Sequence, residues 1–217
     1  DMYEPASKAV RAAGYKYLGA GISGCDRGWL NDVVGKTAEL WNLMDVLSVH
    51  PYGFPCMPDI YGNGGFSNKW NYEGSLMRVK DIFKKNGKLK WYISETGYPV
   101  SPAKPLQVEL RTQADYDMRI MVLGHSYGAS KIELYCFYDR RSFGSGFDAD
   151  DTEMNYGMFY QPDFLGVVKP KPVAAALAAL NHVTDGIRKT ESCDKYTRSD
   201  GTLRAFKMSV EGSGDIY

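Results

Sequence analysis

The sequence lacks the features that mark membrane, nucleic-acid and metal-binding proteins. No apolar run approaches the roughly 20 residues of a membrane-spanning helix. Acidic and basic residues number 26 each among 217, so the basic excess of a typical nucleic-acid binder is missing. None of the four cysteines forms a CxxC pair, which argues against a zinc or thioredoxin-like motif. We therefore expect no metal, no cofactor, and no membrane or nucleic-acid partner.

The four cysteines leave the redox compartment open. Cys25 and Cys56 both fall in predicted loops after strands, so a disulfide between them is possible in a secreted protein. Cys136 lies inside a predicted strand, which favours a free core thiol. Aromatic residues make up 13% of the chain, a composition that suits either core packing or a carbohydrate-facing cleft.

Predicted helices and strands alternate along most of the chain. Hydrophobic spacing and glycine stops predict helices over Tyr3–Ala13, Leu30–Leu43, Ser75–Asn86, Thr112–Leu123 and Pro172–Val183. Apolar runs predict strands over Lys16–Ile22, Val46–Val49, Leu89–Ser94 and Ile132–Tyr138. This order is typical of βαβ units, so we expect an α/β fold whose parallel strands are buried on both faces.

The pattern changes toward the C-terminus. Asp139–Lys171 forms a long loop rich in glycine, aspartate and aromatic residues, and loops of that length are usually functional. Beyond it, the turn residues Asp200–Gly201 and the β-like run Leu203–Met208 indicate a small β-rich appendage. We expect one domain over residues 1–186 and the start of this appendage over residues 187–217.

Two strand ends carry the residues most suited to chemistry. Glu95 closes an apolar strand and is followed by Gly97 and Pro99, where a barrel presents catalytic loops. His50 and Tyr52 follow the preceding strand. Because neighbouring parallel strands end on the same side of a sheet, the imidazole and the phenol should lie within reach of the carboxylate. The alternatives are a strand-end Glu in a surface salt bridge and a structural His.

The order and spacing of several segments resemble the second half of a clan A retaining glycoside hydrolase. These segments are Ala6–Ala13, Ser48–Tyr52, Ser94–Pro99, Gln113–Ala114 with Arg119, Gly128, Asp139, Glu153–Gly157 and Lys169–Pro172. The group comprises (β/α)8 barrels and includes families 5 and 39; the family 39-like bacterial members are the nearest match. The resemblance covers most of the chain and implies strands 5 to 8 of the barrel.

The resemblance also implies a role for each candidate site residue. Glu95 would be the nucleophile that closes the seventh strand. His50 and Tyr52 would hydrogen-bond and orient its carboxylate. Tyr135, or alternatively Phe137, would stack on the sugar in place of the usual tryptophan, and Asp139 would contact substrate. The substrate class would be β-linked plant-type polysaccharides or their oligosaccharides, and the protein would be secreted.

The acid/base partner required by a retaining mechanism is missing from this half. In the glycoside hydrolases that the sequence resembles, the acid/base residue closes the fourth strand. A half-barrel on its own would leave two strand edges and an apolar inner face uncovered. We therefore expect pairing with the protein's own N-terminal half or with a second copy. Glu4 is better explained as an acidic residue in a first helical turn, where the helix dipole favours it.

Two other functions remain open. The chain could belong to a barrel that binds carbohydrate without catalysis, or to an unrelated α/β enzyme that uses Glu95 as a general base. The acidic cluster of Asp148, Asp150, Asp151 and Glu153 could offer calcium ligands, although a solvated loop is the simpler explanation. The glycine-rich stretch 61–65 lacks a lysine and suits a flexible loop better than a phosphate site.

Overall fold

The computed structural model describes residues 3–36, 38–53, 55–59, 71–86, 90–100, 108–140, 150–199 and 203–217. The chain divides into two compact units. The first comprises residues 1–96 and 129–134, and the second comprises residues 97–128 and 135–217. None of the described helices combines the length and apolarity that crossing a membrane requires.

The first unit is built around a four-stranded parallel sheet. Its strands β1 (Leu18–Ser23), β2 (Val46–His50), β3 (Lys90–Thr96) and β4 (Lys131–Leu134) lie side by side in chain order. The unit also contains helices α1 (Tyr3–Ala12), α2 (Arg27–Lys36), α3 (Ala38–Leu43) and α4 (Tyr72–Asn86). The prediction of a mixed α/β fold with a parallel sheet is confirmed.

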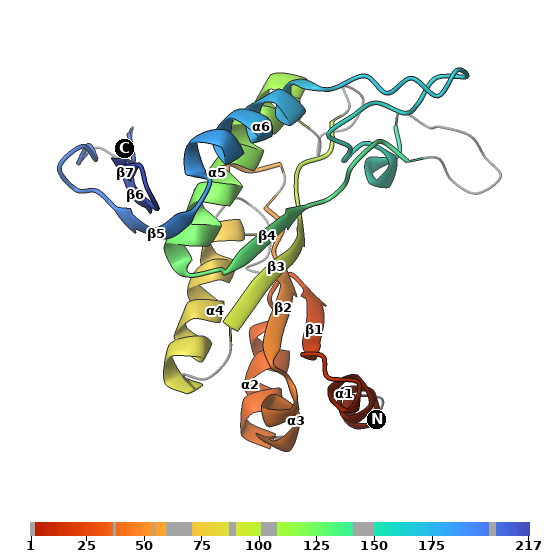
Figure 1. The fold of residues 1–217 in the computed structure, drawn as a ribbon, viewed down its shortest axis with the longest axis vertical. Helices are drawn as coiled ribbons and strands as arrows, with labels where there is room; N and C mark the ends of the chain where they lie inside the picture. Colours follow the sequence, from red (N-terminus) through yellow and green to blue (C-terminus); the bar gives the residue numbers. More distant parts are fainter. Residues whose placement is uncertain are drawn as a thin grey trace. The chain divides into compact units, whose positions relative to one another are not determined.

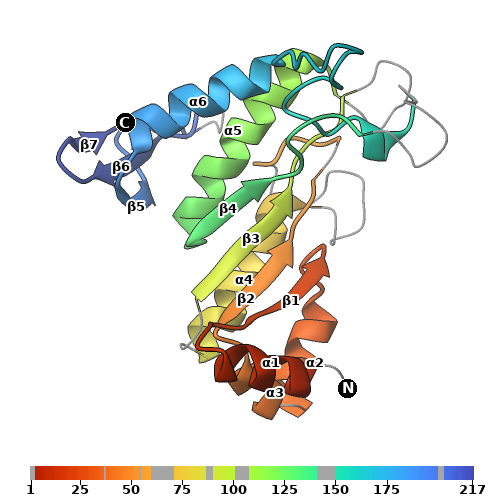
Figure 2. The ribbon, with the colours of Figure 1, turned by 45° about the vertical axis from the view of Figure 1, so that its right-hand side comes forward.

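The two faces of this sheet differ in chemistry. Leu47 is in register with Trp91, and Val49 with Ile93, and all four side chains are buried. Helix α4 lies against one face of the sheet (Figures 1 and 2) and buries apolar residues of its own, among them Leu76. Alternation along a strand sends every second side chain to the opposite face. These four buried apolar side chains therefore share one face.

The opposite face is more polar than the sequence suggested. Lys131 is in register with Tyr92, so the two side chains share this face. Lys131 is exposed and ion-paired with the exposed Glu133, two residues further along β4. Ser48 and Ser94 also lie on this face and hydrogen-bond each other. The expectation of an uncovered apolar inner face is therefore not met at β3 and β4, where charged and hydroxyl side chains lie. On β1 and β2 the same face carries the apolar, in-register Leu18 and Val46, of which Leu18 is exposed.

The second unit combines two packed helices with a small antiparallel sheet. Helix α5 (Leu110–Tyr127) packs along α6 (Pro172–Thr184), as both views show. Strands β5 (Ile187–Ser192), β6 (Phe206–Val210) and β7 (Gly214–Ile216) form the sheet. The single turn η2 (Thr152–Met154) lies between α5 and α6 in sequence. The predicted turn at Asp200–Gly201 falls outside the described residues.

Several predicted boundaries differ from the structure, and two of the differences have a physical cause. The helix predicted over Leu30–Leu43 starts earlier and is two helices, α2 and α3. Asp26 Oδ1 accepts the Trp29 N–H at 3.1 Å and so caps the earlier start, while Gly35 and Thr37 have low helix propensity. The strand predicted over Ile132–Tyr138 ends at Leu134.

Residues beyond Leu134 leave the parallel ladder because they pair elsewhere. The backbone of 136–139 hydrogen-bonds the backbone of 156–159, with Tyr138 and Phe159 forming an isolated bridge. Gly157 lies at the closest approach of these two segments. A Cβ there would collide with Asp139 N and Tyr138 C and lie 2.6 Å from Phe159 O. All three are backbone atoms, so a side chain at 157 cannot be accommodated by a rotamer change.

We predict that Gly157→Ala lowers the free energy of unfolding by about 2–3 kcal/mol, since overpacking against backbone forces the two segments apart. Gly28→Ala in helix α2 is the matched control. Its new methyl group would lie 3.2 Å from one oxygen of the exposed Asp26 side chain and would meet no backbone of another segment, and alanine favours a helix. Urea unfolding of both variants measures the difference. Equal midpoints would contradict the close approach at Gly157.

Candidate active site

The carboxylate of Glu95 lies at the C-terminal end of the parallel sheet. Glu95 is the penultimate residue of β3, and His50 is the last residue of the adjacent β2. Because the strands are parallel and paired, both side chains are at the same edge of the sheet. Thr96 Oγ1 donates a hydrogen bond of 2.6 Å to the Pro51 carbonyl, which ties the end of β3 to the segment that carries Tyr52.

Two side chains face the two oxygens of this carboxylate. The Tyr52 hydroxyl donates a hydrogen bond of 2.6 Å to Glu95 Oε1. His50 Nδ1 lies 3.7 Å from Glu95 Oε2. The side chains of His50 and Glu95 are 23% and 35% exposed, so the carboxylate is partly enclosed yet reachable from solvent. The structure thus brings together the three residues that the strand ends predicted.

A pair of serines that the sequence did not single out extends this cluster. His50 Nε2 lies 3.0 Å from Ser94 Oγ, and the hydroxyls of Ser94 and Ser48 hydrogen-bond each other. The sequence could have indicated Ser48, because residues two apart in a strand share a face of the sheet. Ser48 therefore lies on the same face of β2 as His50. The contact with Ser94 depends on the register between β2 and β3 and had no signal.

The predicted sugar-stacking residues belong to the second unit. The Tyr135 ring makes an edge-to-face contact with Tyr156, with centroids 5.3 Å apart, and the Arg140 guanidinium lies 4.8 Å from its centroid. Phe137 packs against Phe159 at 4.8 Å, yet is 60% exposed. Of the two rings, Phe137 offers the larger open surface.

Asp139 is engaged inside the second unit. Its Oδ1 accepts a bond of 2.6 Å from Lys171 Nζ and one of 2.9 Å from the Gly157 N–H, and the residue is 2% exposed. Burial raises the pKa of the Asp139 carboxyl and lowers the pKa of the Lys171 amine, since desolvation disfavours both charges. This pair links residue 139 to the residue that precedes α6.

Two further polar residues are buried on helix α5. Gln113 Nε2 donates to the Tyr98 carbonyl at 2.8 Å, whereas Gln113 Oε1 and Asp117 Oδ1 have no hydrogen-bond partner among the described residues. Desolvation raises the pKa of the Asp117 carboxyl well above its usual 3.8, opposed in part by a hydrogen bond from the Tyr98 backbone and by the charge of Lys171. Asp117 is therefore held toward its neutral form.

The remaining candidates from the sequence have structural roles or lie outside the described part. Glu4 is exposed in the first turn of α1 and pairs with Lys8 at 2.5 Å. The glycine-rich stretch 61–65 and Asp148 fall among residues not described. Asp151 caps η2 by accepting the Glu153 N–H at 2.9 Å. Within the described ranges, no group of three or more His, Cys, Asp or Glu could hold a metal ion.

No disulfide joins any of the four cysteines, all of which are described, so the predicted possibility of a Cys25–Cys56 disulfide is wrong for this structure. Cys25 is completely buried, and burial raises the pKa of its thiol to about 12, which keeps it protonated and unreactive. Cys136 is free as predicted. It lies beyond β4 and is half-buried, not in the core, because the strand ends at Leu134.

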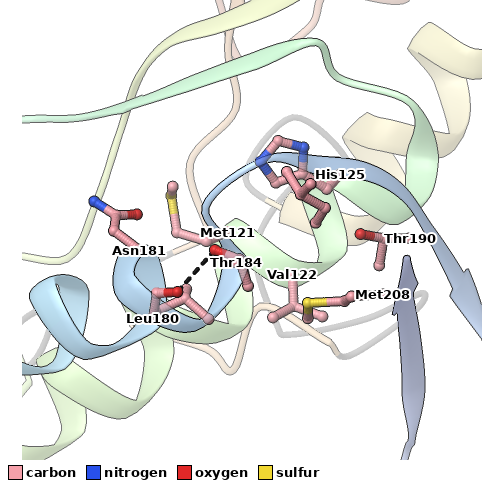
Figure 3. Close-up of a pocket in the computed structure, with 9 residues that line it drawn as sticks. Met121, Val122, His125, Leu180, Asn181, Thr184, Thr190 and Met208 are labelled. Carbon is pink, nitrogen blue, oxygen red and sulfur yellow. Dashed lines mark hydrogen bonds between the residues drawn. The ribbon is translucent and has the colours of Figure 1, made fainter. Parts of the chain in front are cut away.

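A small cavity in the second unit offers no alternative catalytic centre. Side chains from α5, α6, β5 and β6 surround it (Figure 3), including Met121, Leu180 and Met208. No acidic residue lines it, and its volume of about 30 Å³ suits one or two water molecules. Thr190 Oγ1, which has no partner among the described residues, also lines it. The cavity fits bound water better than a sugar ring.

No protein-family model matches the chain, and no curated protein matches it significantly. Solved structures do match. SrfJ from Salmonella typhimurium has a TM-score of 0.58 at 10% identity, over 94% of this chain and 42% of SrfJ. A Rhizomucor miehei β-1,3-glucanosyltransferase, an active-site mutant in complex with laminaritriose, has a TM-score of 0.50 at 12% identity over 79% of this chain and 54% of its own.

The Bifidobacterium dentium β-glucuronidase complexed with coumarin-3-O-glucuronide also has a TM-score of 0.50, at 16% identity, over 82% of this chain and 26% of its own. The chain thus spans less than two thirds of each of these structures. At such identities the likeness concerns the fold alone, which resembles part of each of these structures.

We predict that Asp117→Asn becomes more stable than the unsubstituted chain as pH rises. The folded state binds the Asp117 proton more tightly than the unfolded state, so its contribution lowers the free energy of unfolding as pH rises above about 4. Between the two pKa values the loss is about 1.4 kcal/mol per pH unit. Asparagine has nearly the shape of a protonated aspartate and does not ionise, so the variant does not lose this stability as pH rises.

Urea unfolding at pH 4.5, 6 and 7.5 measures this difference. Asp115→Asn is the control, because Asp115 lies on the same helix and is exposed. Parallel pH curves for the Asp117→Asn variant and the unsubstituted chain would refute a neutral Asp117.

Proposed function

We propose that the chain is the C-terminal half of a retaining glycoside hydrolase, of the clan A group with families 5 and 39, and that Glu95 is its nucleophile. The observation that carries this proposal is the Tyr52–Glu95 hydrogen bond of 2.6 Å at the end of a parallel sheet. A partly exposed carboxylate held at one oxygen by a phenol presents its other oxygen in a fixed direction. The glycosidase-like fold of the structural neighbours supports the same reaction class.

The chemistry assigned to Glu95 is a two-step displacement. In the first step a Glu95 oxygen forms a bond to the anomeric carbon, while the bond from that carbon to the leaving oxygen breaks and that oxygen takes a proton from a general acid. In the second step water attacks the anomeric carbon, releases Glu95 and gives its proton to the same residue, now a base. Each carboxylate oxygen has two lone pairs, so the bond from Tyr52 leaves the nucleophile competent.

The second carboxylate belongs, in this proposal, to residues outside the chain. A retaining mechanism needs it about 5–5.5 Å from Glu95. Glu4, the acidic residue weighed for this role in the sequence, pairs with Lys8 in helix α1. We place the acid/base at the end of a fourth strand that precedes this chain.

Substrate contacts are proposed for the aromatic residues after β4. Phe137, with its open ring, is the better stacking candidate, and Tyr135 is the alternative. Asp139 is the weakest of the predicted substrate contacts, since Lys171 and Gly157 occupy one of its oxygens. The substrate class remains β-linked plant-type polysaccharide or oligosaccharide, met outside the cell.

We predict that Glu95→Gln lowers kcat by about four orders of magnitude in a protein that also contains the preceding strands, because the amide cannot form the glycosyl-enzyme. Aryl β-glycosides with good leaving groups serve as substrates. Glu39→Gln, which changes an exposed carboxylate on helix α3, is the control and should keep full activity.

Chemical rescue separates a nucleophile from a structural carboxylate. With Glu95→Ala, added azide should restore turnover and give the glycosyl azide of inverted configuration, since the anion takes the vacated place. Binding of oligosaccharide without turnover in the unsubstituted protein would instead favour the non-catalytic barrel. Undiminished turnover by Glu95→Gln would refute the assignment.

Open strand edges support a partner for this half. Strands β1 and β4 are the outer strands of the described sheet, and edge strands present unpaired backbone groups. We propose that its own N-terminal half, or a second copy of the chain, pairs with these edges.

Light scattering after size exclusion tests this pairing. We predict a mass above 24.3 kDa for the isolated chain, or complex formation when the N-terminal half is added. A soluble 24.3 kDa monomer that does not bind the N-terminal half would exclude the half-barrel arrangement.

A further inference from the structure

Ser48 and Ser94 stand behind His50, on the side away from Glu95. Ser94 Oγ lies 3.0 Å from His50 Nε2, and the Ser48 hydroxyl bonds the Ser94 hydroxyl. Ser48 is 3% exposed, so its hydroxyl is shielded from solvent. The contacts form a continuous row from Ser48 through Ser94 and His50 to the Glu95 carboxylate.

Donor and acceptor capacity gives this row a direction. An ionised carboxylate can only accept, and a neutral imidazole has one N–H donor and one acceptor nitrogen. His50 Nδ1 faces Glu95 Oε2 at 3.7 Å, and a lone pair on that nitrogen would face negative charge. The proton therefore belongs on Nδ1, which leaves Nε2 as the acceptor. Ser94 must then donate to Nε2, and Ser48 must donate to Ser94.

We infer that Ser48 and Ser94 are positioning residues that hold His50 as the neutral Nδ1–H tautomer, with its N–H directed at Glu95. This inference extends the proposed function, because it assigns a role to two residues of the same site. In water an unconstrained imidazole prefers its proton on Nε2. A hydroxyl that donates to Nε2 removes that preference, and the buried Ser48 hydroxyl keeps the Ser94 donor turned toward the ring.

The consequence for Glu95 is electrostatic. At 3.7 Å the Nδ1–H group is beyond ordinary hydrogen-bond length, so its effect is that of a dipole with the positive end toward Oε2. Tyr52 occupies Oε1 with a true hydrogen bond. Oε2 thus stays free for bond formation, and the positive ends of the Tyr52 O–H and His50 N–H dipoles both point at the carboxylate.

Long-range ¹H–¹⁵N spectra of the ¹⁵N-labelled full chain at pH 7.5 read the tautomer directly. The chain contains three histidines, and the signal missing from His50→Gln identifies His50. We expect a protonated-type Nδ1 and an unprotonated-type Nε2. Ser94→Ala should shift His50 toward the Nε2–H form, Ser48→Ala should shift it less, and Ser94→Thr should restore the original pattern.

Ser130→Ala is the matched control, since Ser130 is exposed beside β4, and it should leave His50 unchanged. Unaltered His125 and His182 signals establish that each variant is folded. An Nε2–H or doubly protonated ring in the unsubstituted chain, or a Ser94→Ala spectrum identical to it, would overturn the inference. No substrate is involved, so this outcome is independent of whether Glu95→Gln loses activity.

Discussion

Parallel pairing of β2 with β3 is the constraint on which the candidate site depends. It brings the ends of two strands to one edge, so that Tyr52 reaches Glu95 although 43 residues separate them in sequence. The register matters as much as the pairing. A slip of one residue would turn the side chain at position 94 to the opposite face, away from Ser48 and His50. The Thr96–Pro51 hydrogen bond reinforces the same register at the strand end.

In the second unit, parts of the chain between β4 and α6 are held by backbone pairing and by a buried ion pair. Residues 136–139 pair with 156–159, and Lys171 binds Asp139 across 32 positions of sequence. Charges taken out of water are costly, and their mutual attraction only partly offsets that loss. The raised pKa of Asp139 and the lowered pKa of Lys171 express this cost. The gain is a defined path for the segment that carries Tyr135 and Phe137.

One face of the parallel sheet carries polar side chains at β3 and β4. Lys131 and Glu133 are exposed there, and Ser94 on the adjacent strand β3 is half-buried, so water can wet this part of the surface. A sheet with open edges and such a face can remain soluble longer than one with an apolar face, while its edges still offer backbone groups to further strands.

Sequence alone determined the alternation of strands and helices, the parallel sheet, and the convergence of His50, Tyr52 and Glu95, because these follow from local periodicity and from the geometry shared by all parallel sheets. The sequence pattern extended β4 beyond Leu134 and joined α2 to α3 in one helix. Apolar runs do not show which backbone groups hydrogen-bond to each other. Tertiary structure decided the Ser48–Ser94 contact, the Asp139–Lys171 pair and the raised pKa of Asp117. Those depend on register and on loss of solvent, which arise from residues distant in the chain and leave no pattern in the local sequence.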